Sequence, residues 1–137
     1  MNEIVLRFVV AVGGAFAVFT GADFALHGIA PAGANFLTVT DQQAFDARDS
    51  HTRFLGGIWL GVGLVFIAAS VWFASLKTAL LASIALIFVG GLARATAMQT
   101  IFALVPETAG SLAVELIGMP LLALWVWRTP SRSSATT

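Results

Sequence analysis

Long uncharged stretches dominate the chain. No charged residue occurs between Arg53 and Lys77, and three further apolar segments have a similar length. A helix needs about 20 residues to cross about 30 Å of hydrocarbon, because each residue advances it by about 1.5 Å. The pattern therefore predicts an all-α fold with four membrane spans, over residues 4–26, 54–76, 78–101 and 108–127.

The composition requires an apolar solvent around the protein. The 137 residues are 58% hydrophobic and 10% charged, and the mean hydropathy is +0.92. Soluble domains contain about 25% charged and roughly 45–50% apolar residues, and a soluble chain this short has too little interior to bury such an excess. We therefore expect a single integral membrane domain, residues 1–137, folded as a four-helix bundle.

The basic residues predict an orientation in the membrane. Four spans place both termini on the same side, and that side carries Arg7, Lys77, Arg128 and Arg132, whereas the opposite side is mostly acidic. Cytoplasmic segments of membrane proteins are enriched in Lys and Arg. We therefore expect cytoplasmic N and C termini and a multi-pass protein of the bacterial cytoplasmic (inner) membrane.

The longest segment outside the expected spans is the extracytoplasmic loop 28–50. A polar run that starts near Asp41 predicts a short amphipathic helix, capped by Thr40 or Asp41. We expect this helix to rest over the outer mouth of the bundle. The Ser/Thr-rich tail 131–137 is expected to be disordered.

Small residues recur at four-residue spacing within the spans, as at Gly13, Ala17 and Gly21, and at Gly57 and Gly61. Helices in lipid gain little from burying apolar side chains, so they associate through close backbone approach, which small residues allow. The pattern predicts tight helix packing. The same glycine faces could form a homo-oligomer or join the protein to a larger membrane complex.

Five ionisable residues form a candidate polar cluster near the outer half of the membrane. Distances along the helices place Asp23, Arg94 and Glu115 within about 5 Å of one depth, with His27 and Arg53 above them. An unpaired charge at membrane depth costs at least about 2–3 kcal/mol. We therefore expect Arg94 to pair with Glu115, and Arg53 with Asp23 or Glu115, in a cluster that is either structural or ligand-binding.

Pro120 follows Glu115 by about one helical turn. Proline has no N–H group, so the carbonyl of Leu116 loses its helical hydrogen-bond partner. The sequence predicts a kink in the last span beside the polar cluster.

Several other kinds of chemistry find little support. The chain has no cysteine, which removes disulfides and thiolate sites, and its seven Lys+Arg balance seven Asp+Glu, so no basic field attracts nucleic acid. His27 and His51 lack the spacing of a zinc motif. We expect no metal and no cofactor. No catalytic signature is present, so the sequence leaves open whether the protein is an enzyme.

Three sequence features resemble a known family. They are the segment 53–61 (RFLGGIWLG), the segment 90–94 (GGLAR) and Glu115 of the last span. They resemble the bacterial membrane family described as domain of unknown function 4345, over nearly the whole chain. The resemblance implies a compact four-span protein without an assigned activity.

Three functional hypotheses follow. The leading one is an accessory protein that joins a larger membrane complex or binds a small amphipathic, lipid-like ligand in an outward-side pocket. The alternative is a membrane enzyme or proton-coupled transporter that uses Glu115 with Arg94. In the third, the ion pairs only fix helix register and the glycine faces dock other spans. The lipid bilayer is the partner common to all three.

Overall fold

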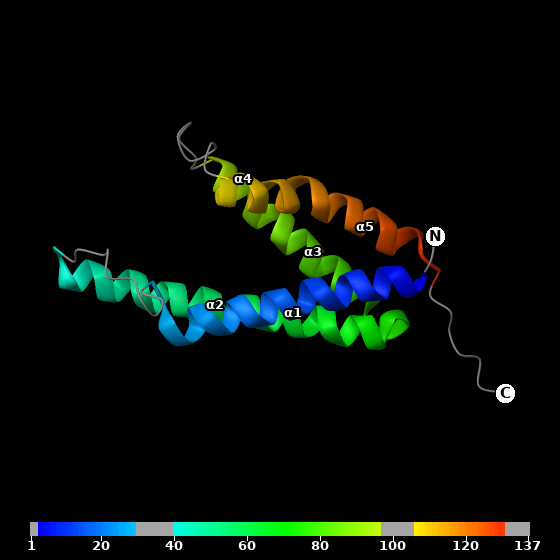
Figure 1. The fold of residues 1–137 in the computed structure, drawn as a ribbon, viewed down its shortest axis with the longest axis horizontal. Coiled ribbons are helices and arrows are strands. Elements are labelled where there is room, and N and C mark those ends of the chain that lie inside the picture. Colours follow the sequence, from blue (N-terminus) through cyan, green and yellow to red (C-terminus); the bar gives the residue numbers. More distant parts are fainter. Residues whose placement is uncertain (1–2, 30–39, 97–105, 131–137) are drawn as a thin grey trace.

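The computed structural model describes residues 3–29, 40–96 and 106–130, and this part of the chain forms helices and no strand. The long helices are α1 (Glu3–His27), α2 (Gln42–Val71) and α3 (Phe73–Thr96). A final helical run comprises α4 (Pro106–Ala113), the π-helical segment η2 (Val114–Gly118) and α5 (Met119–Arg128) (Figure 1).

In the described part of the chain, four helices are long and apolar enough to cross a membrane, judged by length and composition. They are α1, α2, α3 and the run Ala109–Arg128, which joins α4, η2 and α5. Many large apolar side chains on them face outward; Ile4 is 76% exposed, Phe19 76% and Trp127 71%. Lipid is the solvent that accommodates such a surface. The prediction of an all-α, four-span membrane fold is confirmed.

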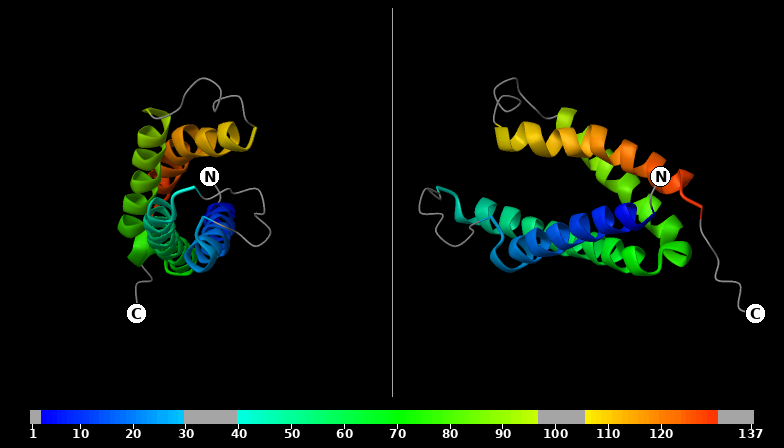
Figure 2. Two further views of the ribbon diagram at one scale, coloured as in Figure 1. Left: turned by 90° about the vertical axis from the view of Figure 1, so that its left-hand side faces the viewer. Right: turned by 45° about the vertical axis from the view of Figure 1, so that its right-hand side comes forward.

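The helices form two arms that meet at one end. Helices α1 and α2 run antiparallel and side by side, and α3 leaves the end of α2 and crosses to the α4–α5 run (Figure 1). Away from the N-terminal end, the α1–α2 pair and the α4–α5 run diverge, as the right-hand view of Figure 2 shows. One end of the molecule is therefore closed and the other is open.

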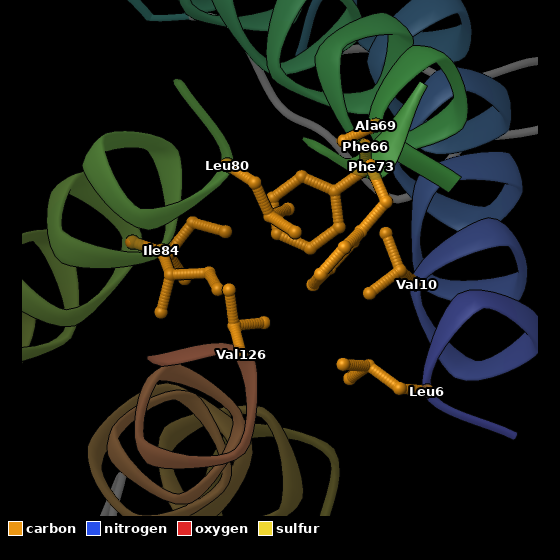
Figure 3. Close-up of a cluster of buried hydrophobic side chains, with 9 residues drawn as sticks. Leu6, Val10, Phe66, Ala69, Phe73, Leu80, Ile84 and Val126 are labelled. Carbon is orange, nitrogen blue, oxygen red and sulfur yellow. The ribbon is translucent and has the colours of Figure 1, made fainter. Parts of the chain in front are cut away.

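The closed end contains the hydrophobic core. Phe73 lies at its centre and is 1% exposed. All four spans contribute, with Leu6 and Val10 from α1, Leu80 from α3 and Val126 from α5 (Figure 3). These positions come from the first half of α1 and α3 and from the last turns of α5. Side chains therefore fill the bundle where its arms converge.

Glycines hold α1 and α2 together by direct backbone contact. A Cβ atom placed on Gly14 would lie 2.9 Å from the carbonyl oxygen of Gly63, and one on Gly56 would lie 2.5 Å from the amide nitrogen of Ala25. Gly21 meets the backbone of Leu60 even more closely. Only glycine permits such an approach, so these positions set the separation of the two helices.

Other glycines have no helix against them. A Cβ on Gly57, Gly61 or Gly90 would find nothing within 4 Å in the described part of the chain. The expected face formed by Gly57 and Gly61 therefore does not pack within the bundle. The α1–α2 contact uses Gly56 and Gly63 instead.

The second helix differs from the expectation at both ends. The expected short helix after Asp41 and the expected second span form one helix of 30 residues, so residues 42–53 neither form a separate helix nor rest over the bundle as one. Asp41 is the N-cap and accepts a hydrogen bond of 3.1 Å from the Ala44 amide. The turn to the next helix lies at Trp72 rather than at Lys77.

Lys77 lies inside α3, and its side chain has hydrogen-bond partners at the end of α5. Its Nζ donates to the carbonyl oxygens of Trp127 (3.1 Å) and Thr129 (2.7 Å), which close the C-terminal end of α5. A charge at this position therefore does not mark the turn. Three parts of the sequence-based expectation lie outside the described residues: residues 30–39 of the expected loop 28–50, residues 97–101 of the third expected span, and the tail 131–137.

Candidate functional site

The centre of the candidate site is an ion pair between two spans. Arg94 Nη1 on α3 donates to Glu115 Oε1 on η2, and Arg94 Nη2 donates to Ser111 Oγ on α4 over 2.9 Å. The Glu115 side chain is 19% exposed and that of Arg94 is 43% exposed. The predicted partnership of Arg94 with Glu115 is therefore present in the structure.

The helix around Glu115 is π-helical, and this sets where the carboxylate points. The segment Val114–Gly118 has the wider π turn, and the Met119 amide donates to the Val114 carbonyl, five residues back. Pro120 comes immediately afterwards and cannot donate to Leu116. The expected disturbance by Pro120 is thus accommodated by a π segment, a feature that often occurs at functional sites.

Gly91 provides the space for this carboxylate. A Cβ atom on Gly91 would lie 2.7 Å from Glu115 Cβ and 3.2 Å from Glu115 Oε2. Glu115 therefore lies against bare α3 backbone, one helical turn before Arg94. A larger residue at position 91 would push the two helices apart and separate the ion pair.

Arg53 does not take either of its predicted partners. Arg53 Nε donates to Asp49 Oδ2 at 2.6 Å, and its Nη1 donates to the Leu26 carbonyl at the end of α1. The Asp49 Oδ1 accepts the Ile29 amide at 2.9 Å. The prediction of a pair with Asp23 or Glu115 was wrong, because a carboxylate four residues earlier on the same helix was closer.

This arrangement, the Asp49–Arg53 clamp, fastens the end of α1 to α2. Gly28 makes the clamp possible: it has φ of +65°, which ends α1, and the Asp49 carboxylate occupies the place of a side chain there. The hydrogen bond from Arg53, followed by that from the Ile29 amide, holds the pKa of Asp49 below its usual value. The clamp is a structural device outside the expected span.

Asp23 and His27 form a pair of their own. The Asp23 Oδ1 and His27 Nδ1 atoms are 2.7 Å apart on successive turns of α1, and both side chains are close to half exposed. In the described ranges, no hydrogen bond or ion pair joins this pair to Arg53, Arg94 or Glu115. The five predicted residues therefore divide into three separate groups.

A cavity of about 430 Å³ lies between the two arms of the molecule. Its walls come from all four spans and are mainly apolar, with Phe66 and Ile87 shared between its lining and the core at the closed end. Glu115 and Ser111 bring the Arg94 network to its edge. The remaining lining residues are Gly13, Phe16, Ala17, Trp59, Val62, Gly110, Val114 and Met119.

Sequence reasoning did not find the aromatic wall of this cavity. Trp59, Val62 and Phe66 recur at helical spacing on α2, a signal that is typical of any buried helix face. Trp59 is fixed by a hydrogen bond of 2.9 Å from its Nε1 to Thr20 Oγ1 on α1. The helical spacing of these three residues was the available signal, and it does not separate a cavity wall from an ordinary packed face.

The chemistry of the site is that of polar recognition at the edge of an apolar cavity. The described residues contain no group of three or more His, Asp or Glu side chains that could hold a metal ion. The site offers a guanidinium, a carboxylate and a hydroxyl, and these groups can bind and orient a polar head while the cavity accepts an apolar body.

One known family matches most of the chain. The family model described as Domain of unknown function (DUF4345) matches residues 5–126, which include α2, α3, most of α1 and of the last span, and every lining residue of the cavity. The chain belongs to the DUF4345 family. Neither the curated proteins nor the solved structures contain a match to it. For this DUF4345 protein, function therefore has to be argued from the site.

Proposed function

We propose that this protein binds a small amphipathic, lipid-like molecule within the membrane, in the cavity between its two arms. The observation that carries the proposal is a cavity of about 430 Å³ with apolar walls from all four spans and the Glu115–Arg94–Ser111 network at one edge. Pockets for small ligands usually enclose about 300–1,000 Å³ and combine apolar walls with a few placed polar groups.

The two arms suit this role in different ways. The α1–α2 arm supplies a rigid aromatic wall, because glycine contacts fix its helices and Thr20 fixes Trp59. The other arm supplies the polar groups on η2 and α4. A ligand in the cavity would contact both arms and replace lipid between them.

The proposed setting is the bacterial inner membrane with both termini in the cytoplasm. Arg7 is stacked over Phe73 at the closed end, and Lys77 binds the end of α5 there. Basic residues at one end of the spans support a cytoplasmic closed end. The cavity would then lie toward the outer leaflet.

An accessory role in a larger membrane complex or a homo-oligomer belongs to the same proposal. The open glycines Gly57 and Gly90 leave space for a further helix. Close approach at such positions is how membrane helices associate.

A matched pair of glycine variants tests ligand binding. Gly13 borders the cavity, and a Cβ there would meet only Phe66 at 3.9 Å, so Gly13→Leu places its side chain in the cavity. Gly61→Leu adds the same side chain to open space outside the cavity. Each variant would be purified in mild detergent and analysed by native mass spectrometry for small molecules that remain bound.

We expect a discrete bound species on the wild-type protein and on Gly61→Leu, and its loss from Gly13→Leu. Equal retention by Gly13→Leu and Gly61→Leu, or no bound species on any of the three proteins, would contradict the proposal. Thermal unfolding of both variants in the same detergent controls for misfolding.

A proton-coupled transporter or membrane enzyme that uses Glu115 with Arg94 is the second candidate. The favouring observation is that Glu115 lies on a π-helical segment beside the cavity, with Oε2 unpaired by any described residue. Proteoliposomes that contain a pH-sensitive dye test it. Proton flux that disappears in Glu115→Gln supports this candidate, and flux equal to that of empty liposomes counts against it.

A further inference from the structure

The two oxygens of the Glu115 carboxylate have unequal surroundings. Oε1 accepts a hydrogen bond from Arg94, whereas Oε2 is closed off from solvent and accepts none from the residues that the structure describes. An ionised carboxylate has about four acceptor positions on its two oxygens. The Glu115 carboxylate therefore has an acceptor oxygen without a donor, and a ligand can supply that donor.

A small motion brings the carboxylate to the cavity. Glu115 borders the cavity, and its side chain is already 19% exposed. The terminal torsion of a glutamate is soft and roughly two-fold, so the carboxylate can turn while the helix stays in place. Arg94 can follow on its long side chain. An incoming donor can then bind an oxygen that has no partner in the structure described.

Charge selects among the possible polar heads. Arg94 and Glu115 carry opposite charges and form a pair with no net charge. An ammonium head would bring a second cation beside Arg94, and a carboxylate or phosphate head would bring a second anion beside Glu115. Like charges at close range are costly away from water. A neutral head that donates a hydrogen bond avoids both costs.

We propose that the cavity recognises a neutral amphiphile with a free hydroxyl group, which donates to the Glu115 carboxylate. This inference rests on the proposed function and names the class of its ligand. The cavity of about 430 Å³ holds roughly fourteen water-sized groups at about 30 Å³ each. One hydrocarbon chain of that size fits against Phe16, Trp59 and Phe66, either as a free alcohol or as part of a hydroxyl-bearing acylglycerol.

The test compares two probes with the same decyl chain, one with a hydrogen-bond donor and one without. Decanol carries a hydroxyl, and decyl methyl ether has the same chain without a donor. Binding of each to the full-length protein in one detergent would be titrated by native mass spectrometry. Hydrogen bonds to charged groups predict that decanol binds roughly 10- to 100-fold more tightly than the ether.

Three variants assign this preference. In the double variant Arg94→Met/Glu115→Leu, which leaves no unpaired charge, both probes should bind and the preference for decanol should disappear. Gly13→Leu should abolish binding of both probes, and Gly61→Leu should change neither. Circular dichroism of each variant confirms that the helices form.

Each outcome separates this inference from the proposed function. Equal binding of decanol and its ether, lost in Gly13→Leu, overturns the hydroxyl inference and leaves the cavity as a ligand site. Tighter binding of decylamine or decanoate than of decanol also overturns it. Failure of all probes to bind, or binding that Gly13→Leu leaves unchanged, overturns the proposed function itself.

A second pair of probes identifies the source of the hydroxyl. Monohexanoylglycerol carries free hydroxyls on a lipid backbone, and its O-methylated form lacks a donor. A preference for monohexanoylglycerol over its O-methylated form, larger than that for decanol over its ether, assigns the site to a lipid headgroup. The reverse assigns it to a free alcohol. No preference in either pair contradicts the inference.

Discussion

The two arms of the molecule are held together by different physics. Helices α1 and α2 touch backbone to backbone at several glycines along their length, including Gly14, Gly21 and Gly56. The α3 helix meets the last span at one such glycine, Gly91, and through the Arg94–Glu115 pair beside it. In the apolar stretch of each helix that is long enough to cross the membrane, 28% of the residues of α1 are buried in the protein but only 6% of those of the last span.

The difference indicates that the two arms are not equally free to move. Dispersion contacts between close backbones fix α1 and α2 and leave little freedom to adjust. The core and Lys77 hold the last span at the closed end, but toward the open end it is held to α3 by Gly91 and the Arg94 side chain alone among the described contacts, which leaves that end freer to move. The cavity lies between the fixed arm and the adjustable arm, as expected for a site that admits a ligand from lipid.

The largest effect is expected where the fixed arm is packed. Gly21→Val would force a side chain into the backbone of Leu60, so we predict a loss of about 3 kcal/mol or more of unfolding free energy. Unfolding in a mixed-detergent titration measures it. The control Gly61→Val enters open space. If the two variants were equally stable, the glycine contacts would not hold the arm together.

A smaller effect is expected from the adjustable arm. Arg94→Met leaves the Glu115 carboxylate unpaired, and we predict a loss of about 1–2 kcal/mol, since Arg94 is 43% exposed. The double variant Arg94→Met/Glu115→Leu should recover most of this loss, because it leaves no lone charge. A double-mutant cycle in the same titration gives the coupling energy, and additive losses would show that the pair is not coupled.

Pro120→Ala should weaken that coupling without unfolding the arm. An alanine restores a donor for the Leu116 carbonyl, which favours an ordinary α-helix over the π segment. Glu115 would then turn away from Arg94 by up to about 100°, the rotation of one residue. We predict a stability change within about 1 kcal/mol and a smaller Arg94–Glu115 coupling energy in the Pro120→Ala background. An unchanged coupling energy would show that Pro120 does not determine the position of Glu115.

The smallest effect concerns pH and the Asp49–Arg53 clamp. The folded-state pKa of Asp49 lies below the usual 3.8, so the stability it contributes is present above 3.8 and is lost as the pH falls through the lowered value. Hydrogen exchange at the Ile29 amide should therefore accelerate below that pH. The Asp49→Ala variant, which has no side-chain acceptor, should show fast exchange at every pH. If the exchange protection of the Ile29 amide in the wild-type protein did not change at low pH, the proposed role of Asp49 in the clamp would be contradicted.

Much of the fold followed from the sequence because lipid imposes simple rules. The uncharged runs predicted four helices, and the unfavourable burial of a lone charge predicted the Arg94–Glu115 pair. The Asp41 cap was one of two expected residues, and the structure selects it over Thr40. These features depend on composition and on position along a helix, both of which can be read from one sequence.

The rest depended on geometry that one sequence does not contain. Depth along a helix placed Asp23 near Arg94 and Glu115, but it did not give the direction in which each side chain points. Arg53 had a partner four residues earlier in Asp49, and this local contact replaced the predicted contact between spans. The cavity arises from the divergence of the arms, and the residue pattern of a single helix does not predict how two helices diverge.

The most direct test of the central claim, that a distinct ligand occupies the cavity, is photo-crosslinking in native membranes. Benzoylphenylalanine would replace Val62, which lines the cavity, and in a second protein Leu64, which is 52% exposed on the same helix. We predict a discrete adduct mass at position 62 and a mixture of bulk phospholipid adducts at position 64. The same phospholipid mixture at both positions would contradict it.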